Sequence, residues 1–198
     1  MSETQKLFDK LNRVVWWAGW RPLTSLVIGG LFGLILTAVV GPLGTVIGLV
    51  LGLALWFNGT RYVNGKAPEI IRAFQTDSET LGRKYLDISE GAEVFQFDNE
   101  SGSSMLVDAA EQYKVITMLV DESSVSVHSA CVLSLPDRSA TVDDSTDELF
   151  YDQVTGVEYE RGIVTIRTSD GGKHQYPSSQ KPESALSAVQ QRVRDYKS

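Results

Sequence analysis

A run of 39 residues without charge or histidine, from Pro22 to Thr60, constrains this chain more than any other feature. A membrane-spanning helix needs about 20 mostly apolar residues to cross about 30 Å of hydrocarbon. One helix made of the whole run would be roughly 58 Å long, too long for a single crossing. The run must therefore fold back, and Gly41-Pro42 marks the reversal because proline disfavours helix in the residue before it.

The segments on either side of this reversal, 23–40 and 43–57, are predicted to form a transmembrane helical hairpin. A cleaved signal peptide is the first alternative, but it has a single apolar segment followed by a cleavage site. A buried hairpin of a soluble protein is the second, and the length of the run disfavours it. A hairpin that dips into the bilayer without crossing it is the third, because the second helix is short.

Small residues recur at every fourth position along both predicted helices. They are Gly29, Gly33 and Thr37 on the first helix and Gly44, Gly48 and Gly52 on the second. In lipid, close backbone approach supplies much of the contact energy between helices. We expect these residues to pack the hairpin, or alternatively to contact another protomer or partner. A leucine at Gly48 should disturb that packing, whereas a leucine at Gly59, outside the stripe, should do much less.

Aromatic and basic residues flank the apolar run and predict where the membrane interface lies. They are Trp16, Trp17, Trp20 and Arg21 before the first helix, and Trp56 and Arg61 at the end of the second. Further basic residues, such as Lys10 and Lys66, lie outside these, and the hairpin tip carries no charge. The positive-inside rule then places the protein in the cell membrane as a multi-pass protein with both termini in the cytoplasm.

Residues 1–21 are predicted to form one amphipathic interfacial helix. Ser2 and Gln5 fit a capping box, and Phe8 and Leu11 fall on one helical face. Beside a membrane, such a helix is expected to lie on the cytoplasmic surface. Packing of this apolar face against the soluble domain is the alternative.

After the hairpin at 22–60, we expect a helical linker at 61–89 and a β domain at 90–198. The linker is predicted to contain two short helices, 67–75 and 78–86, separated by a break. Residues 98–104 and 137–148 are polar and are predicted to be loops. A C-terminal helix with one apolar stripe is predicted at 182–196. The predicted strands are 94–97, 105–109, 114–120 (buried on both faces), a segment around 125–127, 131–135, 150–151, 154–160, 163–168 and 173–176.

Short antiparallel strands followed by an amphipathic helix predict a small, partly open barrel whose terminal helix covers an exposed strand edge. Residues 148–159 read ELFYDQVTGVEY, and 162–171 read GIVTIRTSDG before the final helix. This pattern resembles the second half of bacterial and archaeal PH-like domains, which often occur beside transmembrane hairpins. The resemblance implies an α+β membrane protein with an interfacial helix, a transmembrane hairpin and a PH-like barrel capped by a helix.

Composition excludes several kinds of chemistry. The 25 acidic residues outnumber the 18 basic ones, which argues against nucleic-acid binding. One cysteine and two histidines leave little for a disulfide framework or a zinc site, so no metal or cofactor is expected. His128 and Cys131 could suggest a thiol nucleophile, but a small buried thiol is the preferred interpretation. The acidic residues Asp143, Asp144, Asp147, Glu148 and Asp152 lack EF-hand spacing and predict a solvated loop rather than a cation site.

The functional expectation combines these points. In PH-like domains that bind phosphoinositides, basic residues follow the first strand, but here 98–104 has two acids and no base, so we expect no specific phosphoinositide binding. We expect a non-enzymatic, membrane-anchored interaction or scaffold module that presents its PH-like domain to a protein partner or a second copy. The alternative is an accessory subunit of a larger membrane protein complex, assembled through the glycine-rich hairpin.

Overall fold

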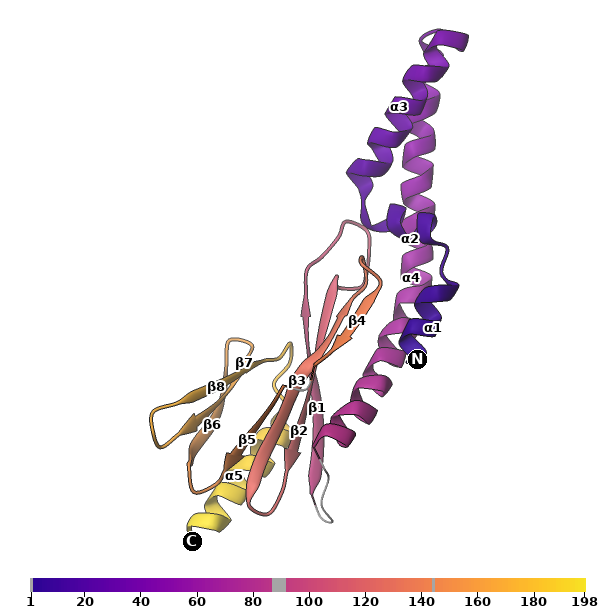
Figure 1. Ribbon diagram of the computed structural model, residues 1–198. Helices are drawn as coiled ribbons and strands as arrows, with labels where there is room; N and C mark the ends of the chain where they lie inside the picture. The colour runs from indigo at the N-terminus through magenta and orange to yellow at the C-terminus, as the bar shows by residue number, and fades with distance from the viewer. Residues whose placement is uncertain (1, 87–91, 144) are drawn as a thin grey trace. The chain divides into compact units, whose positions relative to one another are not determined.

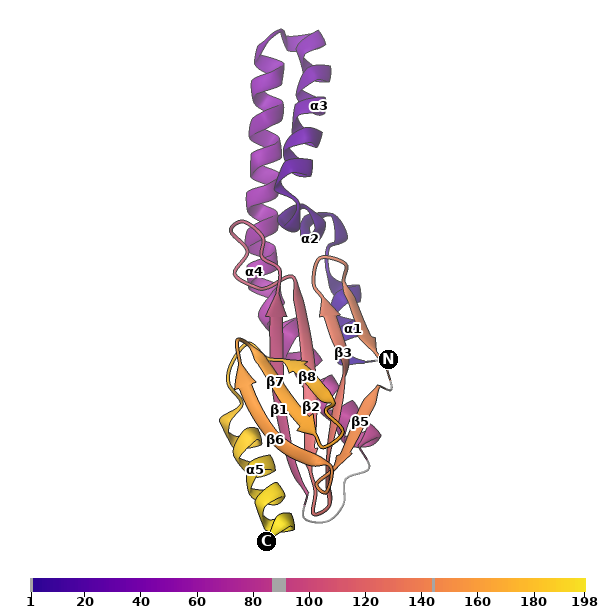
Figure 2. The same ribbon diagram turned by 90° about the vertical axis from the view of Figure 1, so that its left-hand side faces the viewer.

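The computed structural model describes residues 2–86, 92–143 and 145–198 and has an α+β architecture. N-terminal helices are followed by curled antiparallel sheet, a half-barrel, and one C-terminal helix (Figures 1 and 2). The expected domain start at residue 90 lies outside the described residues. The chain forms two compact units: the first contains Met1–Arg72, Gly102–Glu111 and Leu135–Arg138, and the second contains Ala73–Ser101, Gln112–Ser134 and Ser139–Ser198.

The N-terminal segment forms two helices, α1 (Glu3–Lys10) and α2 (Arg13–Trp20), where one was predicted. The reason is local, because Asn12 starts a new helix by accepting a hydrogen bond from the Val15 amide at 3.2 Å. Ser2 caps α1 as predicted, accepting from the Gln5 amide at 3.2 Å. Phe8 is 2% exposed, so the apolar face of α1 lies against protein.

The apolar run forms α3 (Pro22–Val40) and the first part of α4 (Leu43–Tyr85), which lie side by side and antiparallel (Figure 1). The chain reverses at Gly41, whose φ of 70° suits glycine. The predicted break between two linker helices is wrong, because α4 continues through Pro68 to Tyr85. An internal proline costs a helix about 3 kcal/mol. Burial of Val63, Ala67 and Ile70 along one face of α4 offsets that loss.

Within the described residues, eight strands form two antiparallel sheets. In the larger sheet the order is β1-β2-β3-β4, and β5 also pairs with β3; the smaller sheet has the order β6-β7-β8. Helix α5 (Glu183–Lys197) ends the chain. The strands are β1 (Glu93–Ser101), β2 (Gln112–Val120), β3 (Ser124–Ser134), β4 (Ser139–Val142), β5 (Thr146–Phe150), β6 (Val154–Glu160), β7 (Ile163–Thr168) and β8 (Lys173–Pro177).

The predictions for the smaller sheet and for α5 are confirmed, but those for the larger sheet need corrections. The segments around 125–127 and at 131–135, predicted as separate strands, form the long strand β3. Strand β1 continues through part of the predicted 98–104 loop, where Asn99 pairs with Lys114. The predicted strand at 105–109 is a loop, and Leu106 has a φ of 63°. The predicted loop at 137–148 contains β4 and β5. Part of the first polar segment becomes strand because it pairs with β2, and β4 and β5 form because they pair with the long strand β3; local sequence reveals none of these pairings.

Strand β2 is buried on both faces, as its apolar run predicted. On one face, Ile116 and Met118 join the main core with residues of β6, β7 and α5. On the other face lies the end of α4, so close that a Cβ at Gly82 would be 2.6 Å from Thr117 Oγ1. The last turns of α4 therefore cover the second face of the larger sheet.

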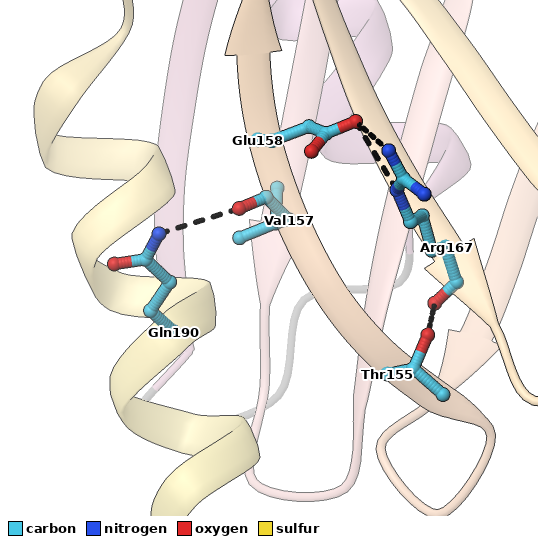
Figure 3. Close-up of polar contacts among 5 residues, drawn as sticks. All are labelled: Thr155, Val157, Glu158, Arg167 and Gln190. Atoms are coloured by element: carbon cyan, nitrogen blue, oxygen red, sulfur yellow. Dashed lines mark hydrogen bonds and ion pairs between the residues drawn. The ribbon is translucent and has the colours of Figure 1, made fainter.

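The outer edge of β6 is covered by α5, as Figure 3 shows. Gln190 Nε2 donates a hydrogen bond to the Val157 carbonyl at 3.3 Å. On the neighbouring strand, Arg167 Nε donates to Glu158 Oε1 at 3.1 Å, and Thr155 Oγ1 donates to the Arg167 carbonyl at 3.1 Å. The C-terminal helix thus satisfies groups on an edge that would otherwise invite pairing with another chain.

The small residues of α3 and α4 face one another across the hairpin. A Cβ at Gly29 would lie 2.5 Å from the Gly48 carbonyl oxygen and 2.6 Å from Gly52 Cα. A Cβ at Gly33 would lie 2.9 Å from the Gly44 carbonyl oxygen. The hydroxyl oxygens of Thr37 and Thr45 are 2.9 Å apart. All six residues of the predicted stripes thus lie between α3 and α4.

Gly59, expected to tolerate a leucine, is also tightly packed. A Cβ there would be 2.5 Å from the Gly19 amide nitrogen, so the expectation of a small effect is wrong. The physical reason is that α2 packs closely against α4 at Gly59. The spacing of small residues along the hairpin gives no indication of this contact. Gly30 is a better control, because its Cβ would meet only Leu49 Cδ2, at 3.9 Å.

The hairpin contact generates the first prediction. Gly48→Leu should destabilise the detergent-solubilised protein by about 1–3 kcal/mol, because the backbones of α3 and α4 must separate. Gly30→Leu should have a much smaller effect. Thermal unfolding of the two variants measures the difference, and equal losses would show that the glycine contact does not stabilise the hairpin.

Candidate functional site

The predicted interface residues divide into two groups by burial. Trp16 is 1% exposed and Trp20 is 6% exposed, so both rings lie against protein. Trp17 and Trp56 are half-buried and keep some surface available to lipid, while Arg21 and Arg61 are exposed. Arg21 lies over the Trp17 ring with its Cζ 5.9 Å from the centroid, and Arg61 lies over Phe57 at the same distance.

Trp16 attaches α2 to the turn after β3. Its Nε1 donates a buried hydrogen bond of 2.8 Å to the Leu135 carbonyl, and its ring meets Tyr62 edge-on at 6.5 Å. Residues 135–138 belong to the same compact unit as the N-terminal helices. Sequence reasoning missed this role because the partner is 119 residues away along the chain.

The loop between β1 and β2 is held in the same unit by Asn64 of α4. Its Nδ2 donates to the Leu106 carbonyl at 3.0 Å, and its Oδ1 accepts from the Asp108 amide at 3.1 Å. Ser104 Oγ also donates to the Trp20 carbonyl at 3.4 Å. Two loops that are remote in sequence are therefore fastened to α2 and α4 by specific polar contacts.

A cleft of about 530 Å³ lies between α2 and the turn after β3. Three of its lining residues are arginines and one is an aspartate, so it carries a formal excess of two positive charges. Trp17 and Val14 form the apolar wall of the cleft, and Val14 is 66% exposed. The cleft is lined by Arg13, Val14, Trp17, Arg21, Pro136, Asp137 and Arg138. Its chemistry suits an anion with an apolar portion.

The structure brings His128 and Cys131 together, with 3.7 Å between Nε2 and Sγ. Both side chains are 0% exposed, and the Tyr85 ring stacks on His128 at 5.1 Å. Burial raises the pKa of the Cys131 thiol, which disfavours the thiolate that a nucleophile requires. The pair therefore has the environment of core packing rather than of a catalytic centre.

Two acidic residues of the predicted loop, Asp147 and Glu148, make contacts between strands. Asp147 accepts a 2.7 Å hydrogen bond from the Tyr176 hydroxyl and lies 3.8 Å from His174 Nδ1. Burial first, and then the contact with Asp147, raise the pKa of Tyr176. Glu148 accepts from Ser124 Oγ at 3.1 Å, and Asp144 lies outside the described residues. Among the described residues, no three side chains of metal-ligating type converge.

No model of a known protein family matches this chain, and no curated protein is similar enough to count as a relative. The likeness to PH-like domains thus stays a prediction that rests on residues 148–171 and the terminal helix. Functional conclusions must come from the residues and their geometry.

The Trp16 contact generates the second prediction. Trp16→Phe should lower the free energy of unfolding by about 1–3 kcal/mol, because the buried Leu135 carbonyl loses the shorter of its two hydrogen bonds and keeps only the one from the Arg138 amide. Trp17→Phe is the matched control, since that ring is half-buried. Thermal melts of both variants would measure the effect, and an equal or larger loss in the control would contradict a structural role for the Trp16 hydrogen bond.

The third prediction concerns Cys131. A maleimide at pH 7.5 should label the folded protein far more slowly than the denatured protein, because the thiol is buried and its pKa is raised. The rate should rise with denaturant in parallel with unfolding. Rapid labelling of the folded chain would instead show an accessible thiolate and would reopen the nucleophile hypothesis.

Proposed function

We propose that this protein is a non-enzymatic, membrane-anchored interaction module that presents its β domain to a protein partner in the cytoplasm. The observation that carries the anchor is the outward orientation of apolar side chains on α3 and α4. Leu23, Ile35 and Val39 are 77%, 68% and 80% exposed. In the most apolar stretch of 18 residues, only 17% is buried in α3 and 28% in α4. The core helix of a soluble protein would be mostly buried, so lipid is the environment that fits these helices.

The length of the helices supports a full crossing over a shallow dip. The 19 residues of α3 extend about 28 Å, close to the thickness of the hydrocarbon layer. Basic residues, among them Arg13, Arg21, Arg61 and Lys66, lie near the ends of the apolar segments, whereas the reversal at Gly41-Pro42 is uncharged. This asymmetry supports a cytoplasmic location for both termini.

The interaction role is supported by an open edge of the larger sheet. In the part of the chain that the structure describes, β4 pairs with β3 and with no other strand. The edge of β6 is covered by α5, and β1 is met by Ser179, whose amide donates to the Asp98 carbonyl at 2.8 Å. An open strand edge can accept an extended segment of another protein through backbone hydrogen bonds.

We also propose that the β domain is PH-like. The curled antiparallel sheets and the following α5 support this finer assignment. The burial of His128 and Cys131 supports the non-enzymatic interpretation, because a substrate would have no access to either side chain.

The alternative function, an accessory subunit assembled through the glycine stripes, receives less support. The six small residues lie in the contact between α3 and α4, so their surface is already used within one chain. A partner in the membrane would have to bind the outward-facing side chains of the hairpin instead, such as Leu34 and Val46.

The fourth prediction tests which surface a partner uses. The full chain, purified in mild detergent, should capture a partner that is identified by mass spectrometry. Val142→Lys, on the open edge, should abolish capture, because lysine on an edge strand opposes pairing. Leu34→Ala with Val46→Ala, on the outside of the hairpin, should leave capture intact. Loss of capture by the hairpin variant alone would favour the accessory-subunit function.

The membrane orientation is tested separately. The full chain should resist extraction by alkaline carbonate, and protease added to sealed inside-out vesicles should digest its β domain. Protection of that domain in inside-out vesicles, with digestion from the opposite side, would contradict the proposed orientation.

A further inference from the structure

We propose that the cleft containing Arg13, Arg21 and Arg138 binds the phosphate of an anionic phospholipid headgroup. The inference rests on the membrane anchoring proposed above, because it takes α3 as a membrane-spanning helix. It assigns a specific ligand class to a surface that the sequence did not identify.

The cleft carries an excess of positive charge. The cleft combines three guanidinium groups with one carboxylate, that of Asp137. Other arginines of the chain pair with carboxylates, as Arg83 does with Glu79 and Arg167 with Glu158. Within residues 2–86, 92–143 and 145–198, none of the ion pairs involves an arginine of the cleft. Guanidinium groups bind phosphate oxygens through paired, charge-assisted hydrogen bonds, so a phosphate would satisfy this excess.

An apolar wall lies beside the arginines of the cleft. The Arg21 guanidinium lies 5.9 Å from the centroid of the Trp17 ring, a cation–π arrangement that restrains it. Val14, also in the lining, is 66% exposed. A free inorganic anion has no use for such a wall, whereas the glycerol and upper acyl region of a lipid would cover it.

The position of Arg21 at the start of α3 sets the depth of the cleft in the bilayer. Arg21 immediately precedes Pro22, the first residue of α3. Because α3 is about as long as the hydrocarbon layer is thick, its first residue lies near the boundary with the headgroups. The cleft therefore opens at the level where lipid phosphates are found, on the side that the basic residues mark as cytoplasmic.

Hydrogen bonds to the Leu135 carbonyl hold the turn that carries Arg138 in place. The Leu135 carbonyl accepts from Trp16 Nε1 at 2.8 Å and from the Arg138 amide at 3.2 Å. Arg138 itself has a φ of 51°, which sets the direction of its side chain from the turn. These contacts fasten the turn to α2, so Arg138 shares one cleft with Arg13 and Arg21 without a large ordering cost on binding.

The location explains how this site differs from the sequence-based expectation. The loop at 98–104 lacks basic residues, but the arginines come from α2 and from a turn more than a hundred residues later. The acidic chain as a whole is repelled by an anionic membrane surface. A local cluster at headgroup depth acts within a Debye length, where the more distant acidic residues are screened.

The experiment uses the full chain in a neutral detergent, which has no surface charge of its own. Dihexanoylphosphatidylglycerol, kept below its micelle concentration, is titrated by calorimetry against dihexanoylphosphatidylcholine and inorganic phosphate. We expect saturable binding of one phosphatidylglycerol per chain and affinity weaker by about tenfold or more for the other two ligands.

A pair of matched double variants locates the site. Arg13→Gln with Arg138→Gln should weaken phosphatidylglycerol binding by roughly tenfold or more. Arg61→Gln with Lys66→Gln removes the same charge from the other membrane-flanking segment and should change affinity by less than about threefold. Arg13, Arg61 and Lys66 are exposed and Arg138 is half-buried, so circular dichroism melts of both variants verify that they remain folded.

Each contrary outcome overturns the proposal. Equal losses in the two double variants would mean diffuse electrostatic attraction, and phosphate binding as tight as phosphatidylglycerol binding would mean a free-anion site. Absence of saturable binding would exclude the site altogether. If carbonate extracted the chain from membranes, the anchoring proposal would fail and the headgroup site would fail with it. Loss of saturable binding in a chain that resists carbonate would overturn the headgroup site alone.

Discussion

The structure depends first on close backbone contact between α3 and α4. An apolar run of this length must reverse, and two helices in lipid gain little from hydrophobic attraction to each other. Glycines at Gly29, Gly33 and Gly48 let the backbones meet where any larger side chain would clash. Helix α4 makes this contact near its N-terminal end. It continues to Tyr85, where its last turns cover the second face of β2.

The first unit, which contains the N-terminal helices, is held together by a few polar contacts between residues far apart in the sequence. Trp16 holds the turn at Leu135, and Asn64 holds the loop at Leu106. The Trp16 hydrogen bond is buried, and each contact joins side chain to backbone across a long stretch of sequence. They also create the arginine cleft, because they bring a turn from the strand region beside α2. The Trp16 hydrogen bond and the arginine cleft thus lie on the same two segments, α2 and the turn at 135–138.

The second unit uses polar residues to join its two sheets and to cover a strand edge. Asp147 and Tyr176 join the two sheets through a 2.7 Å hydrogen bond, and Gln190 covers the edge of β6. His128 and Cys131 are enclosed beneath Tyr85. Among the described residues, β4 pairs with β3 and with no other strand.

The sequence by itself determined the features that depend on neighbouring residues: the reversal at Gly41-Pro42, the glycine spacing, the smaller sheet and α5. Each follows from a local period or turn signal. Tertiary structure alone decided that 137–148 would form strands, that α4 would pass through Pro68, and that Gly59 would meet Gly19. It also brought Arg138 to α2. These outcomes depend on partners remote in the chain, whose pairing and burial energies outweigh the local preferences that a sequence displays.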